Sequence, residues 1–346
     1  MNTPSWVRTV LASAFVLLML ASGHLLMVAI NHVESAPQGL SARMFTDRPL
    51  REELELAAQR TRNPEHRALL QAAARRASEQ GEAFTLRTQQ VTPILWQATL
   101  GLTALGALLM WWTSRLKSDA AQTIVGLFAG NLMWTGGVEY GLTIAARSLG
   151  VAKSVAVVNG EVTAVFGEYV LLKHSWGVLA LVMGYLLFLE SSRCPLFLFW
   201  RERVPTMRGA LVTGRIDNYG PRSAFQYATT VWGFYLLLLW AYDESVFGVH
   251  GFFTTAVLFA SLAGTVYCVW KLNQHTGWGP AIRYAVGAMI VAWTPLEIAG
   301  KWGLFREPWL WLHPTTLVIF FGGLGLGTWL LWKAQRRPAR HSAIDV

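Results

Sequence analysis

The sequence predicts an all-α polytopic membrane protein with about eight transmembrane helices, an extracytoplasmic helical hairpin and a short β-hairpin. Of its 346 residues, 53% are hydrophobic and only 14% are charged, whereas soluble domains carry about 25% charged residues. The chain also contains 17 Trp, a residue that favours the membrane–water interface. We therefore interpret the net charge of +9 as a sign of topology and of contact with membrane lipids, and no nucleic acid is expected as a partner.

The first apolar run extends from Val10 to Ile30 and follows Arg8. Its length of about 20 residues suits a helix that crosses a bilayer. The stretch Ala21-Ser22-Gly23 resembles a weak signal-peptidase site, but the apolar run continues past it. We therefore expect residues 1–30 to form an uncleaved signal-anchor helix.

Seven further runs are long enough to span, and together they define a predicted membrane domain over residues 93–332. They are Pro93–Thr113, Ala120–Ala146, Gly167–Leu189, Ala224–Tyr242, Gly251–Trp270, Ile282–Trp302 and Thr315–Trp332. Lys and Arg gather on one side of these spans, mainly in the loop 191–223 and the tail 333–346. The positive-inside rule then predicts a multi-pass protein of the cell inner membrane with both termini in the cytoplasm.

Residues 31–92 are expected to lie outside the membrane and to contain a helical hairpin over residues 47–81. Asp47 and Asn63 are typical helix N-caps, Pro64 suits a first helical position, and Gly81 suits a helix end. A second exterior element is a β-hairpin over residues 154–166, because Asn159-Gly160 lies between β-branched runs and favours a type I′ turn.

Two Glu-Tyr pairs beside glycine, at Glu139 and Glu168, raise the question of function, because unpaired carboxylates are costly in lipid. The helical rise places Glu139 about 10 Å below the outer end of its span, and His24, His174 and Glu297 at a similar depth. Residues closer to the rim add to this layer: Glu168, Asp243, Glu244, His250 and His313. With them, six of the eight predicted spans contribute a carboxylate or an imidazole to one outer-leaflet layer. The predicted catalytic residues are Glu139, Glu168, Glu297 and Lys173, and the predicted metal ligands are His24, Glu139, Glu168, His174, His250 and His313.

Three functions are compatible with this layer. The first is a membrane enzyme or redox protein that uses a divalent metal (Fe, Zn or Cu) or haem on a lipid-soluble or periplasmic substrate such as a quinone. The second is an ion- or proton-coupled transporter, and the third is a non-catalytic subunit of a membrane complex. The two cysteines, Cys194 and Cys268, form no CxxC or CxxCH motif, and the sequence contains no HExxH or nucleotide-binding motif.

Structural roles are the alternative for several of these residues. Glu297 can pair with Lys301 one turn later, and a lone histidine such as His24 often makes a hydrogen bond inside the protein. Lys173 can extend to the membrane surface or neutralise Glu168 or Glu139. The functional hypothesis therefore depends on the shared depth rather than on any one residue.

Overall fold

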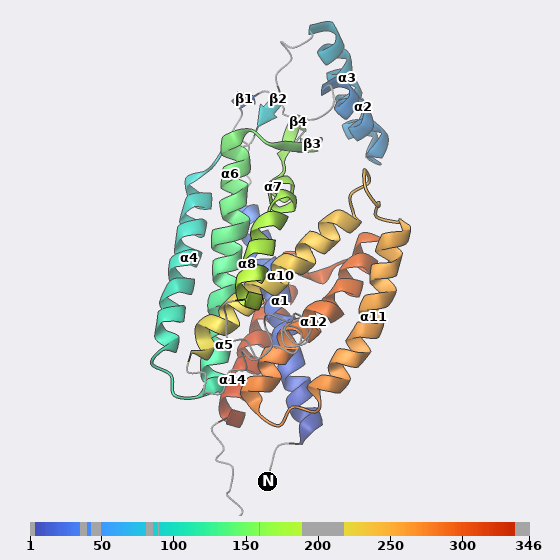
Figure 1. Ribbon diagram of the computed structural model, residues 1–346. Helices are drawn as coiled ribbons and strands as arrows, with labels where there is room; N and C mark the ends of the chain where they lie inside the picture. Colours follow the sequence, from blue (N-terminus) through green and yellow to red (C-terminus); the bar gives the residue numbers. More distant parts are fainter. Residues whose placement is uncertain are drawn as a thin grey trace, which may run out of the picture. The chain divides into compact units, whose positions relative to one another are not determined.

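The computed structural model describes residues 4–34, 40–42, 50–80, 86–88, 90–158, 160–188 and 218–335 (Figure 1). Most of the predicted basic loop 191–223 and of the basic tail 333–346 lies outside these residues. Asp47, Gly81 and Asn159 also lie outside the described residues. The predicted N-cap at Asp47, the predicted helix end at Gly81 and the predicted turn residue Asn159 are therefore not described.

Five helical segments of the described chain are long and apolar enough to cross a membrane. They are α1 (Ser5–Glu34), α4 (Pro93–Thr113), α11 (Phe252–Leu272), α12 (Trp278–Lys301) and the run Pro314–Gln335, which consists of α13 (Pro314–Leu317), η5 (Val318–Gly322) and α14 (Gly323–Gln335). Large apolar side chains on these helices are exposed, for example Leu108, Phe259 and Val266. These features are those of an all-α membrane protein.

The other three predicted spans also coincide with helices, but these are interrupted or less apolar. They are the run of α5 (Asp119–Met133), η2 (Trp134–Tyr140) and α6 (Gly141–Leu149), the run of α7 (Glu168–His174) and α8 (Trp176–Phe188), and α10 (Tyr219–Ala241). The predicted number of eight spans is not confirmed, because only five segments meet the length and hydropathy of a spanning helix within the described chain.

The chain folds as two compact units. Unit 1 comprises Met1–Val28, Leu105–Leu132 and Ser175–Val346, and unit 2 comprises Ala29–Ala104 and Met133–His174. The core of unit 1 is built from α1, α5, α10 and α12, with fully buried side chains such as Phe15, Leu127 and Ile282. α11 packs along α12 in the same unit.

Unit 2 contains both predicted hairpins. α2 (Leu50–Arg60) packs against α3 (Pro64–Gln80), and β3 (Ala152–Val158) pairs antiparallel with β4 (Glu161–Phe166). Gly160, directly before β4, has a φ of +79°, a conformation that favours glycine.

The structure adds two strands that the sequence reading missed. β1 (Leu40–Ala42) and β2 (Leu86–Thr88) extend the hairpin into a four-stranded sheet of order β1-β2-β4-β3, in which β2 and β4 run parallel. α2 and α3 pack on β3 and β4 of this sheet, and Leu54, Leu70, Val155 and Phe166 form the shared core.

Candidate functional site

The residues predicted to form one site divide between the two units. Glu139, Glu168, Lys173 and His174 belong to unit 2, whereas His24, His250, Glu297 and His313 belong to unit 1. Among the residues that the structure describes, no group of three or more His, Cys, Asp or Glu side chains lies close enough together to hold a metal ion. The arrangement thus gives no support to the predicted metal ligands.

Each of the four histidines has a local role. The Nδ1 atoms of His24 and His174 donate to the carbonyl oxygens of the residues four positions earlier, at 3.0 Å and 2.7 Å. His313 is the N-cap of α13, and its Nδ1 accepts from the backbone N–H of Thr315. The ring of His250 stacks on the indole of Trp302 with centroids 5.7 Å apart. These are the ring contacts that the structure gives for the four histidines.

Glu139 lies in a stretch of π-helix, η2, between α5 and α6. Its Oε1 accepts a hydrogen bond of 2.9 Å from the indole Nε1 of Trp134, and its Oε2 is shielded from solvent. The hydroxyl of Thr143 donates to its backbone carbonyl. Short π-helical segments occur frequently at functional sites, which makes η2 a candidate for one.

The glycines before Glu139 allow α4 to approach η2 closely. A Cβ on Gly136 would lie 2.7 Å from Cβ of Leu102 and 3.0 Å from the backbone nitrogen of Thr103. A Cβ on Gly137 would lie 3.3 Å from Oγ1 of Thr103. Only glycine at position 136 fits this contact, as expected where two helix backbones approach closely.

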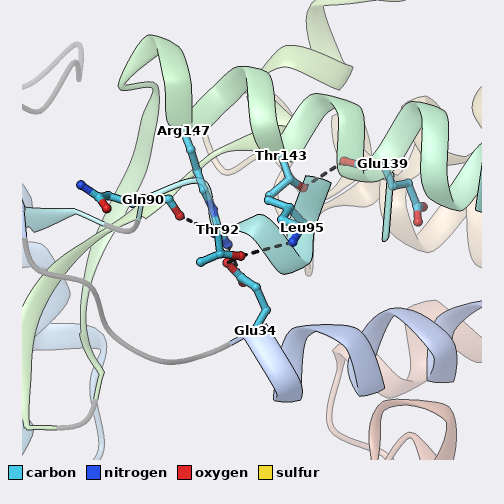
Figure 2. A network of polar contacts seen from close by, with 7 residues as sticks. All are labelled: Glu34, Gln90, Thr92, Leu95, Glu139, Thr143 and Arg147. Atoms are coloured by element: carbon cyan, nitrogen blue, oxygen red, sulfur yellow. Dashed lines mark hydrogen bonds and ion pairs between the residues drawn. The ribbon is translucent and has the colours of Figure 1, made fainter. Parts of the chain in front are cut away.

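A buried ion pair joins three segments of unit 2 near this site (Figure 2). Nη1 and Nη2 of Arg147 donate to Oε1 and Oε2 of Glu34, at 2.5 Å and 3.1 Å, and both side chains are less than a tenth exposed. Thr92 donates its hydroxyl to Glu34 and accepts from the backbone N–H of Leu95, so it also caps α4. Arg147 Nη1 reaches the carbonyl of Gln90 as well. This network fixes the end of α1 and the start of α4 against α6.

The charge of Arg147 acts on residues of both Glu-Tyr stretches. The charges of Glu139, Glu34 and Arg147 all act on Tyr140, and the positive charges that act on Glu168 are those of Arg147 and Lys153. Arg147 therefore links the two Glu-Tyr stretches within unit 2. The charge of Lys153 also acts on Glu168.

Unit 1 holds a separate group of aromatic and acidic side chains. His24 stacks on Trp293, whose ring centroid lies 4.3 Å from that of Trp309. The indole Nε1 of Trp309 donates to Glu307, and the charge of Glu307 acts on Glu297. Lys301 also acts on Glu297, in agreement with the structural role considered for this pair.

Sequence reasoning missed Glu34, Arg147 and Glu307. Glu34 and Arg147 lie just outside the predicted ends of the first and third spans. The opposite charges of these two residues, at the outer ends of two predicted spans, could have suggested an ion pair. The partner choice could not be predicted, because the two residues are 113 positions apart.

Comparisons of the chain with protein-family models, with curated proteins and with solved structures find no match. The function must therefore be inferred from the residues of the site and their chemistry.

Proposed function

We propose that the protein is a membrane transporter in which a monovalent cation, bound at Glu139, is coupled to the movement of a small solute. The observation that carries the proposal is the placement of the Glu139 carboxylate in a π-helical turn, with one oxygen bonded to Trp134 and the other shielded from solvent. Ionisable groups inside a membrane are costly, and they commonly mark ion or proton paths.

The surroundings of Glu139 support cation binding rather than metal or haem chemistry. Transition metals and haem are commonly held by His, Cys or carboxylate side chains that converge on one point. The histidines of the described chain instead make separate local contacts, and His174 is exposed and bonded to its own helix. A monovalent cation or a proton requires only oxygen atoms, which Glu139 supplies.

The topology that we propose for this transporter has eight spans, with both termini in the cytoplasm of the inner membrane. Eight helical runs of the described chain lie where the eight spans were predicted, and α4 has the predicted bounds. α12 carries Pro295 in its interior, two positions before Glu297. Irregular helices with π-turns or internal proline commonly line the binding sites of transporters.

The proposal is tested with the full-length protein in proteoliposomes adsorbed on a solid-supported membrane. Rapid jumps in Na⁺, in pH and then in a panel of small solutes should produce transient currents in the wild type. Glu139→Gln should abolish the cation-dependent currents, whereas Glu161→Gln, which alters an exposed glutamate on β4, should keep them. Currents of wild-type size in Glu139→Gln, or a wild type that responds to no cation, would contradict the proposal.

A further inference from the structure

One arginine of unit 1 is buried without a negatively charged partner in the described chain. Arg8, near the start of α1, is only 9% exposed, and its Nε donates to the carbonyl oxygen of His275 over 2.9 Å. Within the described residues, no hydrogen bond or ion pair joins its Nη1 and Nη2 atoms to another residue. A buried charge without a counter-charge is costly, so a negatively charged ligand would stabilise this side chain.

Two further arginines with little exposure show the usual arrangement. Arg147 donates both Nη atoms to the carboxylate of Glu34. Arg283 pairs through Nη2 with the carboxylate of Asp119 over 3.6 Å. Each of them has a carboxylate, whereas Arg8 has only a neutral carbonyl. The Nη atoms of Arg8 also keep contact with solvent, unlike Nε of Arg147, so a ligand can reach them.

Two contacts hold α1 against the segment that joins α11 to α12. One is the hydrogen bond from Arg8 to His275, and the other runs from the hydroxyl of Thr9 to Oδ1 of Asn273 over 3.2 Å. Because Asn273 accepts through its oxygen, its amide nitrogen remains as a donor beside Arg8. The guanidinium therefore lies in a fixed setting of donors.

The end of unit 1 that contains Arg8 is strongly basic. The charges of Arg8 and Arg283 both act on His275. The helix ends meet here through four contacts, which are Arg8–His275, Asp119–Arg283, Gln122–Tyr219 and Ser118–Gln335. The Lys and Arg residues of these helix ends are Arg8, Arg115, Lys117, Arg222, Lys271, Arg283 and Lys333. Asp119 is the one acidic residue among the described residues there, so the local charge favours an anion.

Exposed tryptophans indicate that this end lies at the level of the lipid headgroups. Trp6, two positions before Arg8, is 65% exposed, and Trp270 near the end of α11 is 57% exposed. The Nζ atom of Lys271 lies 4.9 Å from the ring centroid of Trp270. Tryptophan beside Lys or Arg at the ends of spanning helices is typical of the membrane–water interface. Lipid phosphates are the anions of that region.

We infer that Arg8 binds a phosphate group, supplied by the headgroup of an anionic lipid, between the start of α1 and the segment that joins α11 to α12. The two Nη atoms form a planar fork that matches two oxygens of a phosphate. The bond from Nε to His275 orients this fork. Basic pockets between membrane helices bind phosphate-bearing lipid headgroups in the same way. The site is separate from Glu139 and does not depend on the proposed transport.

Lipid binding by the full-length protein tests this site. The protein is purified in a maltoside detergent, which contains no phosphorus, and is titrated with phosphatidylglycerol or phosphatidylcholine in native mass spectrometry. The wild type should bind its first phosphatidylglycerol more tightly than further copies and more tightly than phosphatidylcholine. Arg8→Gln removes the fork and should weaken this first binding step by about tenfold or more. Arg8→Lys keeps the charge without the fork and should give an intermediate affinity.

The control variant removes the same charge from the same end of unit 1. Arg115 is exposed, and its guanidinium carbon lies 4.0 Å from the ring centroid of Trp111. Arg115→Gln should leave the first binding step unchanged. Thermal unfolding in detergent without lipid shows whether each variant is folded. If Arg8→Gln does not fold, the comparison of Arg8→Lys with Arg115→Lys decides, because only the former should bind phosphatidylglycerol more weakly.

Inorganic phosphate distinguishes the two sources of the bound group. If inorganic phosphate displaces the first phosphatidylglycerol and stabilises the wild type but not the Arg8 variant, the phosphate site stands and its ligand is a free phosphate. If only the lipid binds, the ligand is the headgroup. The site is wrong if the folded Arg8 variants bind lipid and phosphate as the wild type does, or if the Arg115 variants lose as much affinity.

Discussion

Trp134 and Glu139 are hydrogen-bonded over 2.9 Å although they lie five positions apart on one helix. In an α-helix, side chains three or four positions apart share a face. The π-helix has i→i+5 hydrogen bonds and so brings positions five apart to the same face. Both residues belong to η2, which means that the indole–carboxylate contact and the local helix type depend on each other.

Loss of the indole donor should destabilise the fold at η2. Trp134→Phe keeps most of the buried ring but leaves Oε1 of Glu139 without this donor. We expect the free energy of unfolding to fall by about 1–3 kcal/mol, the usual cost of a buried polar group that loses its hydrogen bond. Chemical unfolding in detergent measures the change. Trp176→Phe, on an exposed ring of α8, is the control, and an equal loss there would contradict this explanation.

Two neighbouring glycines should respond in opposite ways to alanine. Gly136→Ala places a methyl group against Leu102 and the backbone of Thr103, so we expect a loss of about 1–3 kcal/mol from overpacking. Gly141→Ala meets nothing within 4 Å, and alanine in a helix is favoured over glycine by about 0.5–1 kcal/mol. Unfolding of both variants under the same conditions is the measurement. A neutral Gly136→Ala would mean that α4 does not pack closely on η2.

The Glu34–Arg147 pair should show the asymmetry of a buried ion pair. Arg147→Met leaves the Glu34 carboxylate buried without its cation and should cost about 3–5 kcal/mol. Combining it with Glu34→Leu removes the unpaired charge and should recover most of this loss. A double-mutant cycle gives the coupling energy. The exposed pair Arg51–Glu55 should give a coupling of about 0.5 kcal/mol or less, because water screens it.

Acid should lower the free energy of unfolding through His275, which lies in the segment between α11 and α12. Burial lowers the pKa of His275 below its ordinary value of 6.5, and the positive charges of Arg283 and Arg8 lower it further. The unfolded chain then binds a proton more readily than the folded protein does. The stabilisation that the neutral ring provides is complete above pH 6.5 and is lost as the pH falls below it. Unfolding curves at several pH values should show a smaller acid sensitivity in His275→Gln, and an unchanged slope would contradict this.

The positions of the helices could be predicted from the sequence, because hydropathy and helix ends are local properties. α4 begins at Pro93 and ends at Thr113 as expected, since proline suits the first turn of a helix and charged residues follow the last one. The parallel pairing of β2 with β4 depends on segments about 75 positions apart in sequence, and no local spacing reports it. The π-helical turn at η2 was also missed, because Gly136, Gly137 and Glu139 are compatible with an ordinary helix as well.

The predicted layer of histidines and carboxylates was based on depth alone. Counting residues along a helix gives the depth of a side chain but not the direction in which it points around the helix axis. His174 therefore has the expected position in the sequence and yet is exposed and bonded to its own backbone. Glu139 kept its importance because its flanking glycines were themselves a signal of close helix contact.

The π-helical turn has a consequence for how this protein is compared with others. A chain that lacked one residue between Trp134 and Tyr140 could run through this region as a plain α-helix, and the tryptophan and the glutamate would then sit four positions apart or on different faces. A glutamate at the matching position would therefore not be enough to indicate that another protein has the same activity. The better marker is the number of residues in this one turn, because the length of the turn decides whether the carboxylate is held in place.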